Sequence, residues 1–106
     1  MDDKTATCSA TLINALGLHA RPSVKLTRLA RTFASEIEIA AGTEGPWIDA
    51  KSIVRVMAVK AAKGVTLRFR AKGPDAAEAL AALRELVMDG FADDEDLSEK
   101  ANPLNG

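Results

Sequence analysis

The sequence contains a single histidine, His19, in the short stretch GLHARPS, which has the features of a helix start. Pro22 suits the first turn of a helix, because its missing N–H would have no acceptor within the helix anyway. A helix N-terminus favours an anion and disfavours a positively charged imidazole. A neutral ring nitrogen is a nucleophile, so His19 is a candidate phosphoryl acceptor, and Arg21 could stabilise the added negative charge.

The local structure of this stretch has two readings. The residue before a proline avoids the helical region, which favours Arg21 as the helix cap and Pro22 as the first helical residue. A start at Ala20 would instead make His19 the cap. A lone histidine at a helix start is, on chemistry alone, more often a surface or capping residue than a phosphate acceptor. Gly17 permits a close approach of backbone or of another protein.

Other kinds of chemistry are disfavoured by the composition. One histidine and one cysteine, Cys8, are too few for the usual four ligands of a zinc site, so we expect no metal and no other cofactor. Cys8 alternates with small residues in a predicted strand, which indicates a buried, unreactive thiol. Glycine-rich phosphate loops of the nucleotide-binding types do not occur in the sequence.

Charge is distributed unevenly along the chain. Residues 19–72 contain eleven Lys/Arg and four Asp/Glu, a difference of +7, whereas residues 73–106 contain two and nine, a difference of −7. A basic body can attract nucleic acid, phosphate groups or an acidic protein. The basic strand residues lack interleaved aromatic residues, which disfavours nucleic-acid binding by base stacking.

The cellular compartment is predicted from what the sequence lacks. It shows no apolar run long enough to span a membrane and no secretory signal at its first residues. A single cysteine cannot form a disulfide within the chain. We therefore expect a cytoplasmic protein that binds neither a membrane nor nucleic acid.

Hydrophobic periodicity predicts seven elements in the order βαββαβα. Period-two alternation is typical of strands, and apolar residues three and four positions apart are typical of helices. The predicted strands are 5–12, 36–40, 47–50 and 65–71, and the predicted helices are 22–33, 52–60 and 75–89. The buried stripe expected for the first helix is Val24, Leu26, Leu29, Ala30 and Phe33.

This order predicts an α/β (α+β) fold in which a four-stranded antiparallel sheet is covered on one face by three helices. The result is an open-faced two-layer sandwich, and we expect residues 4–91 to form this single domain. Residues 92–106 are acidic and then rich in Asn, Pro and Gly. We predict that they form a flexible C-terminal tail.

The short helix 52–60 contains more apolar residues than one buried stripe requires. Ile53, Val54 and Met57 are among them, and some must reach the surface of so small a domain. The segment therefore predicts a partner-binding patch. The alternative is a fully buried helix or a strand.

The stretch GLHARPS, residues 17–23, resembles the active-site motif of the HPr family. These proteins are the histidine-containing phosphocarriers of the phosphoenolpyruvate-dependent phosphotransferase system. The resemblance covers roughly residues 4–91 and includes the order of the elements. AKSIVRVM, residues 50–57, resembles the second signature of the family. The segments AKG, GPDAAEAL and DGFADDED look more like the nitrogen-related branch than the sugar-transport branch.

The resemblance implies a phosphocarrier, expected as a monomer, and not a turnover enzyme. His19 would take a phosphoryl group at Nδ1 from enzyme I and pass it to an acceptor of the EIIA type. Arg21 would assist, and the backbone amides of Ala20 and Arg21 would hold the phosphate. The alternative function is a regulatory binding module that acts through the apolar patch without phosphotransfer, which the joint presence of His19 and Arg21 disfavours.

The resemblance also assigns roles to the short helix. Ser52 aligns with the serine that HPr kinase/phosphorylase modifies in some members, and a helix-capping role is compatible with phosphorylation there. Ile53, Val54 and Met57 align with the apolar patch that docks partners. Arg55 replaces the glycine of some members, so the partner choice of those members does not carry over directly. Ser23 stands where the family often has alanine.

Overall fold

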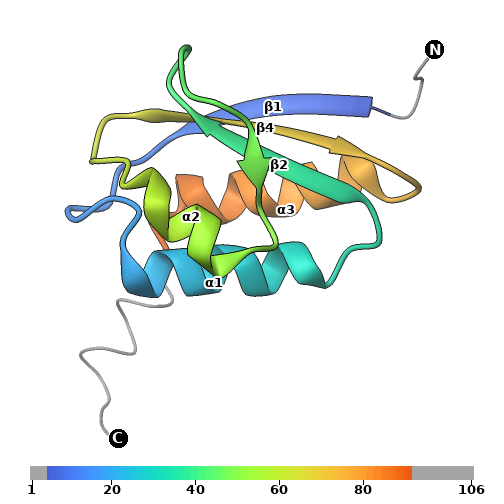
Figure 1. Ribbon diagram of the computed structural model, residues 1–106, viewed down its shortest axis with the longest axis horizontal. Coiled ribbons are helices and arrows are strands. Elements are labelled where there is room, and N and C mark those ends of the chain that lie inside the picture. The colour runs from blue at the N-terminus through green and yellow to red at the C-terminus, as the bar shows by residue number, and fades with distance from the viewer. Residues whose placement is uncertain (1–4, 92–106) are drawn as a thin grey trace, which may run out of the picture.

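The computed structural model describes residues 5–91, which form two layers, a sheet and a set of helices (Figure 1). The elements follow the predicted order βαββαβα. They are β1 (Thr5–Thr11), α1 (Ala20–Arg31), β2 (Glu36–Ala41), β3 (Ile48–Asp49), α2 (Ile53–Val59), β4 (Thr66–Lys72) and α3 (Ala76–Met88). The predicted tail, residues 92–106, and residue 4 of the predicted domain lie outside the described residues.

The sheet is antiparallel throughout, with the strand order β1-β4-β2-β3. The last strand in sequence, β4, lies between the first two, and Phe69 of β4 is paired with both Cys8 of β1 and Ile39 of β2. The three helices cover one face of this sheet and leave the other uncovered (Figure 1). The structure confirms the predicted open-faced sandwich.

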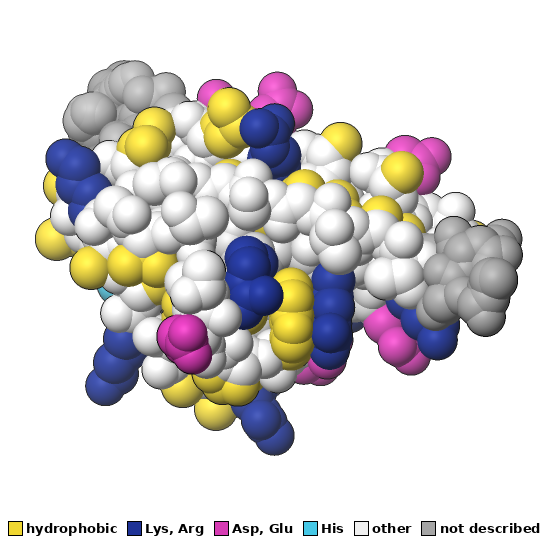
Figure 2. Space-filling view, turned by 90° about the horizontal axis from the view of Figure 1, so that it is seen from above, with side chains coloured by type: hydrophobic (Ala, Val, Ile, Leu, Met, Phe, Trp, Pro, Cys, Tyr) yellow, Lys and Arg dark blue, Asp and Glu magenta, His cyan; other side chains and the backbone are white. Residues whose placement is uncertain are grey.

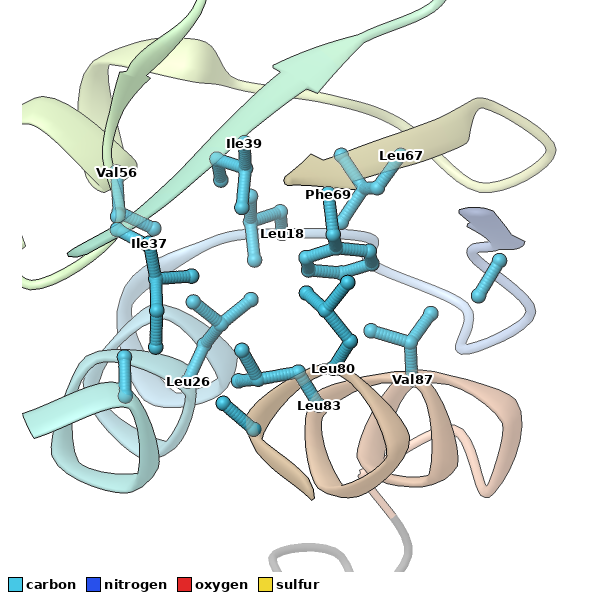
Figure 3. Packing of buried hydrophobic residues seen from close by; sticks show 14 of the residues in the cluster. Leu18, Leu26, Ile37, Ile39, Val56, Leu67, Phe69, Leu80, Leu83 and Val87 are labelled. Carbon is cyan, nitrogen blue, oxygen red and sulfur yellow. The ribbon is translucent and has the colours of Figure 1, made fainter. Parts of the chain in front are cut away.

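The core lies between the sheet and the helices, and alternation along the strands directs the side chains into it. Phe69 and Leu67 of β4 are fully buried, as is Ile39 of β2. Leu26 of α1 and Leu83 of α3 meet them from the helix layer (Figure 3). Apolar area removed from water in this way contributes most of the stability of a small domain.

The first helix differs from its prediction in its start, its end and its buried face. It ends at Arg31, so Phe33 lies beyond it. It begins at Ala20, two residues before Pro22, and His19 is its cap. The preference for Arg21 as cap is therefore wrong, because the structured loop before the helix overrides the weak restriction that proline places on its neighbour. Val24 is not on the buried stripe but 39% exposed, and the polar Ser23 and Thr27 are buried in its place.

The second helix settles the choice left open for residues 52–60. These residues form neither a strand nor a fully buried helix: Val56 points into the core, whereas Val54 and Met57 are 74% and 40% exposed. Ser52 caps the helix, since its Oγ accepts a hydrogen bond from the backbone N–H of Arg55 at 3.3 Å. The prediction that part of this apolar surface reaches solvent is confirmed.

The aromatic residue predicted to begin the strand 47–50 instead precedes β3, and its side chain lies on the uncovered face of the sheet. Trp47, from the loop before β3, lies against the guanidinium groups of Arg68 and Arg70, at 4.8 Å and 4.3 Å from the ring centre. Arg70 also pairs with Glu38 at 2.6 Å. Basic side chains accordingly stand among apolar and acidic ones on this face (Figure 2). Cation–π contact and ion pairing engage both arginines within the chain.

A carboxylate clasp joins two turns at one end of the fold. Asp75, before α3, accepts hydrogen bonds from the backbone N–H groups of Ala34 and Ser35, both at 2.9 Å, and from the Ser35 hydroxyl at 2.6 Å. The hydrogen bond from the Ser35 hydroxyl is the largest of the interactions that lower the pKa of Asp75. The ionised form of Asp75 therefore stabilises the folded protein.

The Asp75→Asn variant is predicted to lose stability at neutral pH and to lose part of its acid sensitivity. A lowered folded-state pKa contributes stability that is present above the unfolded-state value of about 3.9 and disappears as the pH falls through the folded-state value. Urea unfolding between pH 7 and pH 2.5 would measure both effects. Glu44→Gln is the control, because Glu44 is exposed. Parallel pH profiles for Asp75→Asn and the wild type would contradict the role of the clasp.

Candidate functional site

His19 occupies the N-cap position of α1 with its imidazole uncommitted to capping. Its backbone is extended, with φ −119° and ψ −155°, and its carbonyl accepts the first helical hydrogen bond from the Ser23 N–H at 2.8 Å. Its side chain makes no capping hydrogen bond and the residue is exposed. The backbone thus fixes His19 at the helix end while the residue stays exposed to solvent.

The helix end beside His19 is electrostatically positive. Ala20 and Arg21 belong to the first turn, where N–H groups point out along the helix axis, and Pro22 contributes no N–H. No acidic residue stands in this first turn to offset the positive end of the helix dipole. Arg21 adds an exposed guanidinium. The structure therefore brings the predicted residues His19, Ala20 and Arg21 together at a site suited to an anion.

The loop before His19 is clamped against the segment that follows α2. Gly17 has a φ of +68°, and a Cβ on it would lie 2.4 Å from the Ala61 carbonyl oxygen and 2.9 Å from the Ala62 Cα. The N–H of Leu18 donates to the same Ala61 carbonyl at 2.9 Å. The close approach expected at Gly17 is real, and its partner is the backbone of this chain.

Asn14 is a positioning residue that the sequence analysis treated only as part of a loop. Its Nδ2 donates to the Gly17 carbonyl at 2.8 Å, and the Gly17 N–H donates back to the Asn14 carbonyl at 3.1 Å. The side chain is buried, so these bonds are shielded from water. Asn and Gly are both turn-forming residue types, and their presence in NALG is the sequence signal for this loop.

Ser23 lies directly beneath the site, at the position where the sequence analysis noted a departure from alanine. It is fully buried, and within residues 5–91 its hydroxyl has no hydrogen-bond partner. An unsatisfied buried hydroxyl lowers stability, so the free energy of unfolding is lower with serine here than it would be with alanine. Serine and alanine are both small residues, which suits a fully buried position.

The two ends of α2 serve different parts of the structure. Its C-terminal end leads to Ala61 and thus to the loop that positions His19. Its N-terminal end, with Ser52, lies beside the end of α1, because Arg31 Nε donates to the Lys51 carbonyl at 2.9 Å. Ser52 is therefore not part of the His19 site, and α2 connects the two positions.

Exposed apolar side chains flank the site, including one that the sequence analysis did not single out. Val54 and Met57 on α2 are accompanied by Leu16, which is 71% exposed in the clamped loop two residues before Leu18. Arg55 is exposed beside them and Ile53 is half-buried. Exposed apolar side chains therefore occur on this loop as well as on the helix. A loop signal such as NALG does not reveal that its leucine stays in solvent.

Cys8 faces the helix layer, as predicted from the alternation in β1. It is half-buried, and its Sγ lies 3.8 Å from the Leu80 carbonyl oxygen. Burial raises the pKa of its thiol, which disfavours the reactive thiolate. Within residues 5–91, no group of three His, Cys, Asp or Glu side chains could hold a metal ion. Over the same residues, none of the helices has the length and apolar character needed to cross a membrane.

A family model and several known proteins match most of this chain in sequence. Residues 6–89 match the family model described as "PTS HPr component phosphorylation site". The phosphocarrier protein HPr of Cupriavidus necator is 45% identical over 85 residues, which are 80% of this chain and 93% of that protein. The phosphocarrier protein NPr of Escherichia coli K12 is 37% identical over 83 residues, 78% of this chain and 91% of that protein.

Solved structures agree with the sequence relatives. HPr-C-His from Thermoanaerobacter tengcongensis superposes with a TM-score of 0.76 at 30% identity, over 82% of this chain and 96% of that one. The phosphocarrier protein HPr from Bacillus anthracis has a TM-score of 0.74 at 29% identity, over 80% and 99% of the two chains. The similarity covers nearly the whole length of each of these proteins.

The Gly17→Ala variant should test the clamp, with Gly42→Ala as its matched control. Both glycines have a φ near +65°, but a Cβ at Gly42 would meet nothing within 4 Å. The control should lose about 1–2 kcal/mol of unfolding free energy, because it carries only the backbone strain. Gly17→Ala adds the clash with Ala61 and should lose at least about 3 kcal/mol of unfolding free energy. Chemical denaturation measures both values. Equal losses for the two variants would show that the close approach is unimportant.

Proposed function

The chain belongs to the HPr family, the phosphocarriers of the phosphotransferase system, and on this premise we propose that His19 is its phosphoryl acceptor. A phosphocarrier is not a turnover enzyme, because it accepts a phosphoryl group from one protein and passes it to another. The observation that carries the assignment to His19 is its position as the cap of α1 with an exposed imidazole that makes no capping hydrogen bond. It is also the only histidine in the sequence.

The proposed transfer uses the positive helix end. As a ring nitrogen of His19, Nδ1 by resemblance to the family, attacks phosphorus, the new N–P bond forms and the bond from phosphorus to the donor breaks. The phosphoryl oxygens then lie near the first-turn amides of Ala20 and Arg21, where the helix dipole favours negative charge. The guanidinium of Arg21 stabilises the same charge. These groups hold the phosphate without forming a covalent bond to it.

Membership of the family implies partners within the phosphotransferase system. We propose phospho-enzyme I as the donor and an EIIA-type protein as the acceptor. The exposed Val54 and Met57, with Ile53 and Arg55, support docking of such partners beside His19, because burying apolar side chains on association is favourable. We further propose that the protein works as a monomer in the cytoplasm, for which its single, unpaired cysteine is suited.

Ser52 is proposed as a second, regulatory phosphorylation site for HPr kinase/phosphorylase. It caps α2 immediately before the proposed docking residues and is half-buried. A phosphate there would place negative charge next to Ile53 and Val54, and desolvating that charge would oppose docking. Phosphorylation at Ser52 would thus weaken partner binding without touching His19.

His19→Ala should abolish labelling by phosphoenolpyruvate and enzyme I while leaving the unfolding curve unchanged, because an exposed side chain is removed. Arg21→Ala should retain labelling but slow it by about 10- to 100-fold, since Arg21 stabilises charge and forms no bond. The assay follows acid-labile phosphate with enzymes I of the sugar-transport and nitrogen-related types. Acid-labile phosphate on His19→Ala would refute the assignment. If neither type of enzyme I labels the wild-type protein, the result would favour the alternative function, a regulatory binding module without phosphotransfer.

Regulation at Ser52 can be tested separately. Incubation with HPr kinase/phosphorylase and ATP should add one acid-stable phosphate, which peptide mass mapping places on Ser52. Ser52→Asn is the matched variant, since asparagine keeps a capping oxygen but offers no hydroxyl to phosphorylate. It should stay unmodified and keep wild-type transfer through His19. An unmodified Ser52 in the wild type would rule out this form of control.

A further inference from the structure

An open groove of about 610 Å³ runs along the outer side of the helix layer, between α1 and the end of α3. We call it the α1–α3 groove. It combines basic and apolar side chains, because Arg21, Lys25 and Arg28 line it together with Val24, Leu29 and Leu86. Its first residues, Ala20 and Arg21, are also the first-turn residues beside His19. The groove is therefore continuous with the proposed phosphate site.

The described chain ends just past α3, the helix that contributes Leu86 to this groove. α3 runs opposite to α1, so that its end lies at the same end of the molecule as the start of α1 (Figure 1). After α3, Gly90 and Phe91 both have a positive φ, 66° and 56°, which turns the chain, and Phe91 is buried. The Phe91 N–H donates to the carbonyl of Leu86, the α3 residue that lines the groove.

The chain that follows has the opposite charge to the groove. Residues 92–106 contain five acidic residues, Asp93, Asp94, Glu95, Asp96 and Glu99, against one basic residue, Lys100, a net charge of −4. Leu97 stands among the acidic residues. The family match stops at residue 89, and the Cupriavidus necator relative covers 80% of this chain with 93% of its own length. The acidic segment thus lies beyond the part of the chain shared with the family.

We propose that residues 93–99 bind back onto the α1–α3 groove of the same chain. Their carboxylates contact Arg21, Lys25 and Arg28, and Leu97 contacts the apolar surface of Val24, Leu29 and Leu86. Asp93 to Asp96 lie two to five residues after Phe91, a reach of about 7–17 Å. The groove extends about 18 Å along α1, so the segment can place its charges beside the basic side chains without leaving this face.

The bound segment would restrain phosphotransfer, and this consequence rests on the proposed function of His19. Its carboxylates would lie beside Ala20 and Arg21, where the phosphoryl group is to be held, and like charges in one site repel. They would also reduce the positive field that speeds association with an acidic partner. Both effects weaken as salt rises, because the Debye length falls from about 10 Å at 0.1 M to about 3 Å at 1 M.

Paramagnetic relaxation enhancement on the full chain tests binding directly and does not depend on phosphotransfer. A nitroxide is attached at Ser98→Cys in a Cys8→Ser background. We expect broadening of the amides of Lys25, Arg28 and Leu29, which disappears in 1 M NaCl. It should also disappear in a neutralised variant that carries Asp93→Asn, Asp94→Asn, Glu95→Gln and Asp96→Asn. Lys25→Glu should reduce it, whereas Lys63→Glu, on an exposed lysine outside the groove, should not.

Three results would overturn the proposal. One is equal broadening of the groove and of the uncovered face of the sheet, and another is broadening that survives neutralisation of the segment. The third is broadening in a mixture of two kinds of chain: nitroxide-carrying chains without ¹⁵N, and ¹⁵N-labelled chains without a nitroxide. Broadening in that mixture would show that the segment of one copy binds the groove of another.

A kinetic arm then separates this inference from the proposed function. Neutralising the segment should raise the rate of labelling by phospho-enzyme I several-fold at low salt and leave it unchanged in 1 M NaCl. Absence of any labelling of the wild type would count against His19 as acceptor and leave the relaxation result standing. Normal labelling without groove broadening would count against the bound segment alone.

Discussion

The close approach of Gly17 to Ala61 is the contact on which the position of His19 depends. A side chain at Gly17 would overlap the Ala61 carbonyl oxygen, and that same oxygen accepts the Leu18 N–H one residue before His19. Asn14 closes the loop from its other side. The loop is therefore held from both ends, and its fixed position determines where α1 begins. This explains why the helix begins at Ala20 in spite of the proline two residues later.

The electrostatic character of the site follows from that helix start. With His19 as the cap, the amides of Ala20 and Arg21 lie in the first turn of α1, and no acidic side chain in that turn competes for them. In the proposed transfer, a phosphate added to the ring would meet donors already in place, so little reorganisation would be needed. The basic side chains further along α1 extend this positive region into the α1–α3 groove.

The α2 helix links parts of the molecule that serve different purposes. Val56 anchors it in the core, its exposed face offers Val54 and Met57, and its two ends reach the His19 loop and the end of α1. Under the proposed function, a change at its capping serine would therefore alter the docking surface while His19 keeps its geometry. The Asp75 clasp, which joins the turns before β2 and α3, adds stability away from these functional surfaces.

The amino-acid sequence alone determined the order of the elements, the open-faced fold and the candidate residues His19 and Arg21, because alternation, helical periodicity and a seven-residue motif are all local signals. It also indicated surplus apolar surface on the short helix. Only the tertiary structure decided which residue caps α1, that Val24 lies outside the core, and that Trp47 covers two arginines of β4. These features depend on contacts between residues far apart in the sequence, such as Gly17 with Ala61 and Trp47 with Arg68. Local propensity does not encode a contact of that range, since its free energy exists only once the layers have packed.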